Sequence, residues 1–347
     1  MKKRNIFIVC GFVLLGILLV FMIKGSTTDK DVITIDIGYQ SVTSQTWGAL
    51  IMKNQSLFEQ KLNEKFPDTK IRVNWHNEVS GAAINSNMVS SKYQIGFMGN
   101  MPCLINGYNG TTMGNYDSIL VAIDGKGLNG KNQGIVVPKG SSIKTVADLE
   151  GKTVSVPVGS SAHFMLLQIL NRYDLIDKVT ILHQDVTIAS TLLETNKIDA
   201  FAAWDPYPRL LIENGSAELL ADGSESNSDY LTGIMVNKTW AEKNNDILVL
   251  FLESLLEAHD YIINNPEQAA RIFADETAFP EAITLQEAKE IKWEAAIYDR
   301  DRVSFEECLK FLIDIDQIKA FDFNSVIDTS YLNQAIENLK MDLAKSL

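Results

Sequence analysis

Short apolar runs alternate with longer segments of helical periodicity through the first two thirds of this 347-residue chain. Runs of four to six residues rich in Val and Ile are typical of buried strands. We therefore expect strands at residues 32–37, 71–75, 95–98, 118–123, 134–137, 153–158, 179–182, 198–203 and 231–236. Between them the pattern predicts helices at 45–63, 81–88, 142–149, 160–173 and 188–195. From residue 246 onward it predicts only helices, at 246–264, 266–277, 285–297, 305–318 and 330–345.

Alternating strands and helices predict an α/β protein with open, mostly parallel sheets. In such sheets ligands lie beyond the carboxyl ends of the strands. These ends carry polar or aromatic residues in five segments, at residues 39–44, 99–101, 159–163, 184–185 and 204–207. We expect a ligand site to be assembled from some of them.

The most informative of these ends begins at Gly159, which separates a strand from a helix. Ser160 or Ser161 is a good N-cap for that helix. The free N–H groups and the dipole of a helix start favour an anion there, and His163 in the first turn adds a possible donor. The alternative is an ordinary turn in which the serines only cap the helix. The helix has an apolar face, expected to pack against the sheet, formed by Phe164, Leu167 and Leu170.

The N-terminus carries an export signal. Basic residues at positions 2–4 precede an uninterrupted apolar run of 18 residues at 6–23, which as a helix spans about 27 Å, close to the hydrocarbon thickness of a bilayer. The positive-inside rule leaves the basic end in the cytoplasm and exports the rest. Either a cleaved signal peptide or an uncleaved anchor fits. We expect an anchor, because residues 23–27 make a poor cleavage site and Cys10, inside the run, is a poor lipidation site.

Charge and cysteine content exclude several classes of protein. Beyond residue 30 the chain has 26 basic and 43 acidic residues, a net charge of −17, which repels nucleic acid and anionic lipid surfaces. An anionic ligand must then be held by local dipoles. Cys103 and Cys308 suggest no disulfide framework and are typical of small buried hydrophobes. The four histidines are scattered, so we expect no metal and no cofactor.

Several phrases together resemble a known family. They are VVPKGSSIKTVADLEGKTVSVPVGSSAH, IDAFAAWDPYP, GFMGNMP and LVLFLESLLEAHDYIINNPEQA, and they are similar to substrate-binding proteins of ABC importers in the nitrate/sulfonate/bicarbonate group. The resemblance covers roughly residues 32–320. One position departs from it, because Gln94 stands where the family usually carries an acidic residue.

The resemblance implies a two-lobed, type II periplasmic binding protein fold with a ligand cleft between the lobes. Residues 1–30 would be the anchor and tether, 32–123 with 232–347 lobe 1, and 124–231 lobe 2. The chain would cross between lobes twice, and we expect hinges near 123–125 and 231–233. The family's cleft positions map onto residues 40–44, Gly99 and Asn100 in lobe 1 and onto Ser160, Ser161, His163 and Asp205 in lobe 2, and within 40–44 the candidates are Gln40, Ser41 and Ser44.

Several candidate residues also have a purely structural interpretation. Trp204 and Tyr207 either line the cavity or fill the core beside Pro206. Asp205 either accepts a ligand ammonium or caps the following helix. Gln40 and Asn100 either bind ligand or satisfy amides of their turns.

The resemblance implies an exported receptor that delivers a small solute to ABC permease and ATPase subunits at the outer face of the cytoplasmic membrane, or in the periplasm if the leader is cleaved. The solute would be a sulfonate or taurine-like anion, or nitrate or bicarbonate. Relatives also bind uncharged vitamin precursors or heterocycles.

Two other classes of protein stay open. One is an enzyme, although Ser160 lacks a G-x-S-x-G elbow and cannot face His163 from the same turn, and a pyrimidine-precursor synthase of this fold uses a cysteine cluster. The other is a sensor domain of a signalling system.

Overall fold

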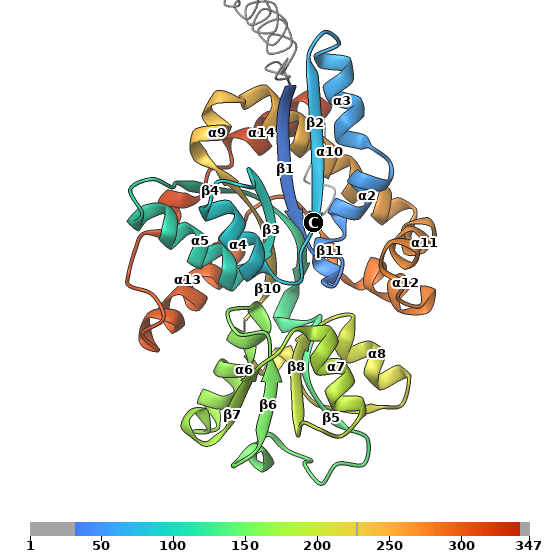
Figure 1. Cartoon of the computed structure of the whole chain (residues 1–347), viewed down its shortest axis with the longest axis vertical. Coiled ribbons are helices and arrows are strands. Elements are labelled where there is room, and N and C mark those ends of the chain that lie inside the picture. The colour runs from blue at the N-terminus through green and yellow to red at the C-terminus, as the bar shows by residue number, and fades with distance from the viewer. Residues whose placement is uncertain (1–31, 227, 341–347) are drawn as a thin grey trace, which may run out of the picture.

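The computed structural model describes residues 32–226 and 228–340, so the N-terminal segment expected to anchor the chain lies outside it. Two sheets form the centres of two lobes, one above the other in Figure 1. The larger sheet has the order β11-β4-β10-β3-β1-β2 and the smaller β7-β6-β8-β5-β9. None of the helices in the described ranges is long and apolar enough to cross a membrane.

Lobe 1 contains the six-stranded sheet, made of β1 (Val32–Tyr39), β2 (Lys70–Asn77), β3 (Ile95–Gly99), β4 (Ser118–Gly127), β10 (Tyr230–Asn237) and β11 (Lys292–Trp293). Lobe 2 contains the five-stranded sheet, made of β5 (Gln133–Pro138), β6 (Thr153–Val156), β7 (Thr180–His183), β8 (Ala200–Trp204) and β9 (Ala217–Asp222). The described part of lobe 2 contains the helices α6 (Ser161–Arg172), α7 (Val186–Glu194) and α8 (Tyr207–Glu213).

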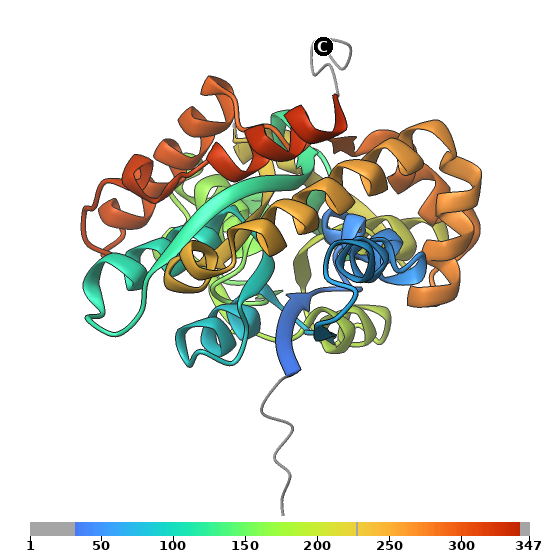
Figure 2. The same ribbon diagram turned by 90° about the horizontal axis from the view of Figure 1, so that it is seen from above.

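Ten helices surround the lobe 1 sheet in the part of the chain that the structure describes. They are α2 (Gly48–Asn54), α3 (Leu57–Lys65), α4 (Gly81–Val89), α5 (Asn100–Thr112), α9 (Lys238–Lys243), α10 (Asn245–Asn264), α11 (Pro266–Thr277), α12 (Glu281–Glu290), α13 (Asp299–Asp314) and α14 (Ser330–Leu339). The long helix α10 and the C-terminal helix α14 pack side by side on one face (Figure 2).

The lobe 1 sheet lies between two apolar layers. On one side Phe251 of α10 makes edge-on contacts with Phe58 of α3 and Phe97 of β3. On the other, residues of α4, α5 and α13 form a second buried cluster. That cluster includes Phe164 of α6, whose ring lies 5.5 Å from the ring of Phe311 on α13. The prediction that Phe164 packs against its own sheet is therefore wrong, because its side chain joins the two lobes instead.

The expectation of mostly parallel sheets is also wrong. Within residues 32–226 and 228–340, four strand pairs are parallel, namely β1–β2, β1–β3, β6–β7 and β6–β8. Five are antiparallel, and each of these involves β4, β5 or β10. These are the strands next to the crossings between lobes. A chain that leaves one sheet and later returns to it runs back alongside its outgoing strand.

Both crossings lie slightly to the lobe 2 side of the expected hinges. Residues 123–125 and 231–233 are inside paired strands, with Gly233 opposite Ile123 and Tyr230 opposite Gly127. The segments that connect the sheets are residues 128–132 and 223–229. They touch each other closely, because a Cβ added to Gly130 would lie 2.0 Å from the carbonyl oxygen of Gly223.

Several helices differ from expectation for local reasons. The helix expected at 45–63 is a 3₁₀ turn followed by α2 and α3, which are separated at Ser56 in the left-handed conformation, φ +52°. The segment 142–149 contains only one 3₁₀ turn, Val146–Leu149. Helix α12 ends at Glu290, where β11 follows instead of further helix. Strand β9 was not predicted, since Glu218 interrupts its apolar pattern.

Candidate functional site

Strand ends from both lobes meet around a small cavity. Its wall consists of Gln40, Thr43, Gly81, Gly99 and Pro102 from lobe 1, Ser160, Ser161 and Trp204 from lobe 2, and Tyr230 at the start of β10. The cavity is small: the volume open to the centre of a water molecule is only about 10 Å³, so the cavity holds about one water. The lobes are therefore closed on each other, and a solute larger than water can enter only when they separate.

The start of α6 faces this cavity. Ser160 is the N-cap, and its hydroxyl accepts a hydrogen bond from the backbone N–H of His163 at 3.3 Å. The next hydroxyl, that of Ser161, is buried and has no hydrogen-bond partner. Gly99 of the opposite lobe covers it so closely that a Cβ at Gly99 would lie 2.1 Å from Ser161 Oγ. An unpaired hydroxyl at a helix start leaves donor capacity available for a ligand.

Hydrogen bonds cross between the lobes beside the cavity. The indole N–H of Trp204 donates to the carbonyl oxygen of Val42 at 2.8 Å. The backbone N–H and the hydroxyl of Ser44 both donate to the carbonyl oxygen of Asp205, at 3.1 and 3.0 Å. The loop after β1 is thus fastened to the end of β8. Trp204 both lines the cavity and holds the lobes together.

Five of the ten residues predicted for the site line the cavity, namely Gln40, Gly99, Ser160, Ser161 and Trp204. Ser44 and Asp205 connect the lobes beside it. Ser41 and Asn100 have partners elsewhere, since Asn77 Nδ2 donates to the Ser41 hydroxyl at 2.8 Å and Asn100 Nδ2 donates to the Asp229 carbonyl at 3.4 Å.

His163 also lies outside the cavity wall. Its Nδ1 accepts a hydrogen bond from the backbone N–H of Gly159 at 3.3 Å. Burial, with a smaller contribution from the nearby His183, lowers the pKa of the His163 ring to about 4. The ring is therefore neutral at physiological pH and brings no positive charge to the cavity.

The sequence pattern did not single out Thr43, Gly81, Pro102 and Tyr230 as cavity residues. Thr43 lies inside the loop at 40–44 to which the cleft was mapped, and Pro102 belongs to the phrase GFMGNMP, but neither was chosen as a candidate residue. Tyr230 was missed because the apolar run of its strand begins one residue later. An aromatic residue at the junction of a crossing and a strand is the signal that would have identified it.

A charged cluster bridges the lobes next to Asp205. Arg209 of α8 places Nε 2.7 Å from Glu287 Oε1 and Nη2 2.8 Å from Glu290 Oε2, both on α12 of lobe 1. Within lobe 2 the same guanidinium lies 3.4 Å from Asp205 Oδ2. Burial, the nearby Asp205 charge and incomplete compensation by Arg209 raise the pKa of Glu287 to about 8. Burial also raises the pKa of Asp205.

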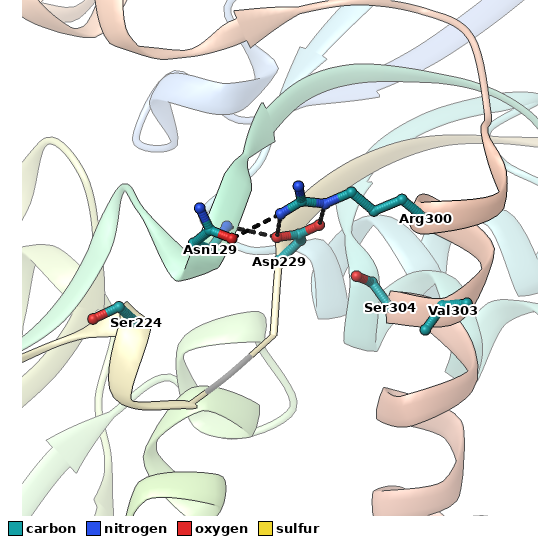
Figure 3. Close-up of a pocket in the computed structure, with 6 residues that line it drawn as sticks. All are labelled: Asn129, Ser224, Asp229, Arg300, Val303 and Ser304. Atoms are coloured by element: carbon teal, nitrogen blue, oxygen red, sulfur yellow. Dashed lines mark hydrogen bonds and ion pairs between the residues drawn. The ribbon is translucent and has the colours of Figure 1, made fainter.

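A second ion pair fastens the crossings (Figure 3). Arg300 of α13 contacts both carboxylate oxygens of Asp229, through Nε at 2.7 Å and Nη2 at 2.8 Å. Asp229 also accepts a 2.6 Å hydrogen bond from the backbone N–H of Asn129 on the outgoing crossing. One carboxylate therefore joins both crossings to lobe 1, at the edge of a pocket of about 270 Å³.

The described residues contain no group of three or more His, Cys, Asp or Glu side chains arranged to hold a metal. Cys103 and Cys308 are both buried, and burial raises the pKa of each thiol. Neither lines the cavity. A thiol of this kind is a poor nucleophile.

Two lobes, each built on its own sheet and closed over a small polar cavity, define a periplasmic binding protein fold. Solved structures agree: the alkanesulfonate-binding protein of Xanthomonas axonopodis pv. citri, bound to MOPS, superimposes with a TM-score of 0.73 at 22% identity, covering 85% of this chain and 98% of that one. A desulfurization enzyme has the same fold, with a TM-score of 0.62 at 12% identity, covering 88% of this chain and 99% of that one. The fold implied by the resemblance is confirmed.

Sequence comparisons show which proteins of this fold the chain is similar to. Residues 120–269 match the NMT1/THI5-like family. A putative aliphatic sulfonates-binding protein of Bacillus subtilis (strain 168) is 26% identical over 319 residues, 90% of this chain and 92% of that protein. One from Escherichia coli (strain K12) is 27% identical over 248 residues, 70% of this chain and 72% of that protein. The chain is thus similar to the sulfonate-binding members of the ABC importer group that its sequence phrases resemble.

Proposed function

We propose that this chain is the extracytoplasmic solute-binding component of an ABC importer and that it captures a small organic sulfonate between its lobes. The observation that carries the proposal is the buried, unpaired hydroxyl of Ser161 at the start of α6, where the first N–H groups of a helix have no partner within it. Similarity to aliphatic sulfonate-binding proteins over nine tenths of the chain supports the same ligand class.

The chemistry of the cavity favours an anionic head with a short apolar tail. The helix start offers backbone N–H groups and hydroxyls to oxyanion atoms. Trp204, Pro102 and Tyr230 offer apolar surface close by. His163, in the first turn of α6, is neutral at physiological pH. Among the described residues no lysine or arginine lines the cavity wall. A sulfonate fits such a site because its charge is spread over three oxygens that hydrogen-bond donors can reach.

The remaining roles follow from this proposal. Lobe 2 would span about residues 128–229, with the rest of the described chain as lobe 1, and the apolar run at 6–23 would hold the protein at the outer face of the cytoplasmic membrane. The partners would be permease and ATPase subunits. A binding role without turnover is favoured over catalysis, since neither Cys103 nor Cys308 reaches the cavity and both thiols are held protonated by burial.

Calorimetric titration of the full-length chain with matched solutes tests the proposal. Butanesulfonate is expected to bind saturably, whereas butanol, which lacks the anionic head, is not. Butanoate and nitrate test whether any anion suffices. The mixture is then analysed for chemical change after prolonged incubation, and recovery of unaltered sulfonate is the expected result. Failure of every anion to bind would contradict the proposal, and turnover would assign the chain to the enzymes of this fold.

A further inference from the structure

The cluster around Arg209 connects the two lobes at the residue that follows Trp204 in the chain. Arg209 and Asp205 belong to lobe 2, whereas Glu287 and Glu290 belong to α12 of lobe 1. The side chains of Asp205 and Glu287 are only 10% and 0% exposed, while that of Glu290 is 41% exposed. The contacts of Arg209 with Glu287 and Glu290 therefore join the lobes, whereas its contact with Asp205 lies within lobe 2.

We infer that closure of the lobes takes up one proton at the Asp205–Glu287 pair, so that the proton is a second ligand linked to capture of the solute. The inference about the pair concerns closure itself. Its link to the solute rests on the proposed function.

The charge balance of the closed cluster requires a proton. One guanidinium faces two buried carboxyl groups and one exposed carboxylate. If both buried groups were ionised, one negative charge would stay uncompensated on side chains that are only 10% and 0% exposed, which is costly. A proton held by the pair removes that charge and leaves one ion pair with Arg209. The raised pKa values of Glu287 and Asp205 agree with this balance.

Other groups near Glu287 do not supply a second positive charge. Asn132 Nδ2 lies 3.4 Å from Glu287 Oε2 and the Ser44 hydroxyl is a further neutral neighbour. Helix α11 packs against α12, and its charged residues form exposed ion pairs, Arg271 with Glu281 and Glu267 with Lys289. On α10, His259 is paired with Asp124, 2.7 Å away. On the side of Asp205, Lys131, Glu213 and Asp222 line the same pocket as Asp205 and Arg209. Among the described residues, Arg209 is the cation that forms ion pairs with Asp205 and Glu287.

When the lobes open, the Asp205–Glu287 pair is separated and no longer needs a proton to balance its charge. Glu287 then parts from Asp205 and reaches water, where a glutamate titrates near pH 4. Asp205 keeps Arg209, four residues along the same helix start. The closed form consequently binds one more proton than the open form between about pH 5 and pH 8. Closure is favoured as the pH falls, and solute affinity should weaken by up to about tenfold for each pH unit of increase in that range.

A distance measurement between the lobes tests the inference without any solute. Exposed Val79 of lobe 1 and Ile188 of lobe 2 are each replaced by cysteine for spin labels, in the full-length chain in mild detergent with Cys10→Ser. Cys103 and Cys308 are buried and stay unlabelled. Lowering the pH from 8.5 to 6 is expected to move the population toward the short, closed distance.

Two variants assign the response. Glu287→Gln mimics the protonated carboxyl and should give a closed population that no longer depends on pH. Glu290→Gln removes an exposed carboxylate from the same arginine and should keep the pH dependence. Asp205→Asn removes the other buried carboxyl group and replaces Glu287→Gln as the test variant if the latter does not fold. We expect its closed population to lose the pH dependence as well.

Titration calorimetry with butanesulfonate in buffers of different ionisation enthalpy then measures the link to the solute. Uptake of about one proton per solute near pH 6.5 is expected in the unaltered chain, and none in Glu287→Gln. A lobe distance that does not respond to pH, or a response retained in both Glu287→Gln and Asp205→Asn, would overturn the inference. If the distance responds to pH but no anion binds, the proposed function fails and the proton-linked closure stands.

Discussion

The indole N–H of Trp204 donates a 2.8 Å hydrogen bond to the carbonyl oxygen of Val42 across the boundary between the lobes. The same indole lines the cavity, so a residue that touches the solute also holds the lobes closed. Trp204→Phe keeps an aromatic surface but loses this bond. We expect solute affinity to fall about three- to tenfold, the value of one neutral hydrogen bond, with little change in thermal stability. Titration calorimetry measures the affinity.

Trp75→Phe is the matched control, because its indole N–H bonds Glu59 within lobe 1 at 3.0 Å. That variant should lose a similar bond without a change in solute affinity. Equal losses in both variants would mean that the Trp204 bond does not contribute to closure.

The second prediction concerns the charge at the start of α6. Ser161→Ala should weaken sulfonate binding about tenfold through loss of one hydrogen bond to a charged group. Ser161→Asp should weaken it far more, because a carboxylate would face the anion in a closed cavity. The fold should tolerate aspartate at a helix start. Ser330→Asp, at the equivalent first position of α14, is the control and should leave binding intact. Unchanged affinity in Ser161→Asp would place the anionic head elsewhere.

The third prediction concerns Gly99, which covers the Ser161 hydroxyl. In Gly99→Ala the new methyl would lie 2.1 Å from Ser161 Oγ and 3.2 Å from Ser161 Cβ, so the lobes cannot close fully until the serine turns away. We expect at least tenfold weaker binding and a larger radius of gyration with saturating solute in small-angle scattering. Gly114→Ala, where a Cβ meets nothing within 4 Å, is the control. In a Ser161→Ala background the further loss from Gly99→Ala should be smaller, since the closest clash is gone.

The fourth prediction concerns the ion pair that joins the crossings to α13. Burial alone would raise the pKa of Asp229, but hydrogen bonds from Arg300 and Asn129 outweigh it and lower that pKa. Arg300→Met removes the guanidinium and should lower the free energy of unfolding by about 1–2 kcal/mol, a modest value because Arg300 is half exposed. Arg271→Met, which breaks an exposed pair, should change it by less than about 0.5 kcal/mol.

The pH dependence of this effect has a defined sign. A carboxyl whose folded pKa is lowered stabilises the fold above its unfolded pKa of about 4, and that contribution disappears as the pH falls through the folded value. The difference between Arg300→Met and the unaltered chain, measured by urea unfolding, should therefore be constant near pH 7 and shrink below about pH 4. A difference that grows on acidification would contradict the assignment.

The fifth prediction concerns the N-terminal segment. Because its apolar run is long and its exit is a poor cleavage site, the mature protein should retain residues 1–24 and fractionate with the membrane. Mass spectrometry of the intact mature chain measures this. A soluble product beginning at residues 25–28 would replace the anchor by a cleaved signal and leave export in place.

The local sequence pattern predicted a residue's place in the site where that place depends on the residue's own helix or strand. The start of α6 and the end of β8 could be predicted as cavity residues because strand ends and helix starts can be recognised from the sequence. The prediction failed for residues whose hydrogen-bond partners are distant along the chain. Ser41 is held by Asn77, and Asn100 by the Asp229 carbonyl, so their side chains turn from the cavity. The cluster of Arg209 and Glu287 joins positions 78 residues apart, and no periodicity encodes it.

The close approach of Gly130 and Gly223 has a mechanical consequence. The two crossings touch at residues without side chains, and the strands that lead into them, β4 and β10, are paired from Tyr230 to Asn237. Because the two connections lie side by side, opening of the lobes would change backbone angles in one small region and leave each sheet intact. The walls of the cavity would then move as two preformed halves, with the start of α6 on one and Gly99 on the other.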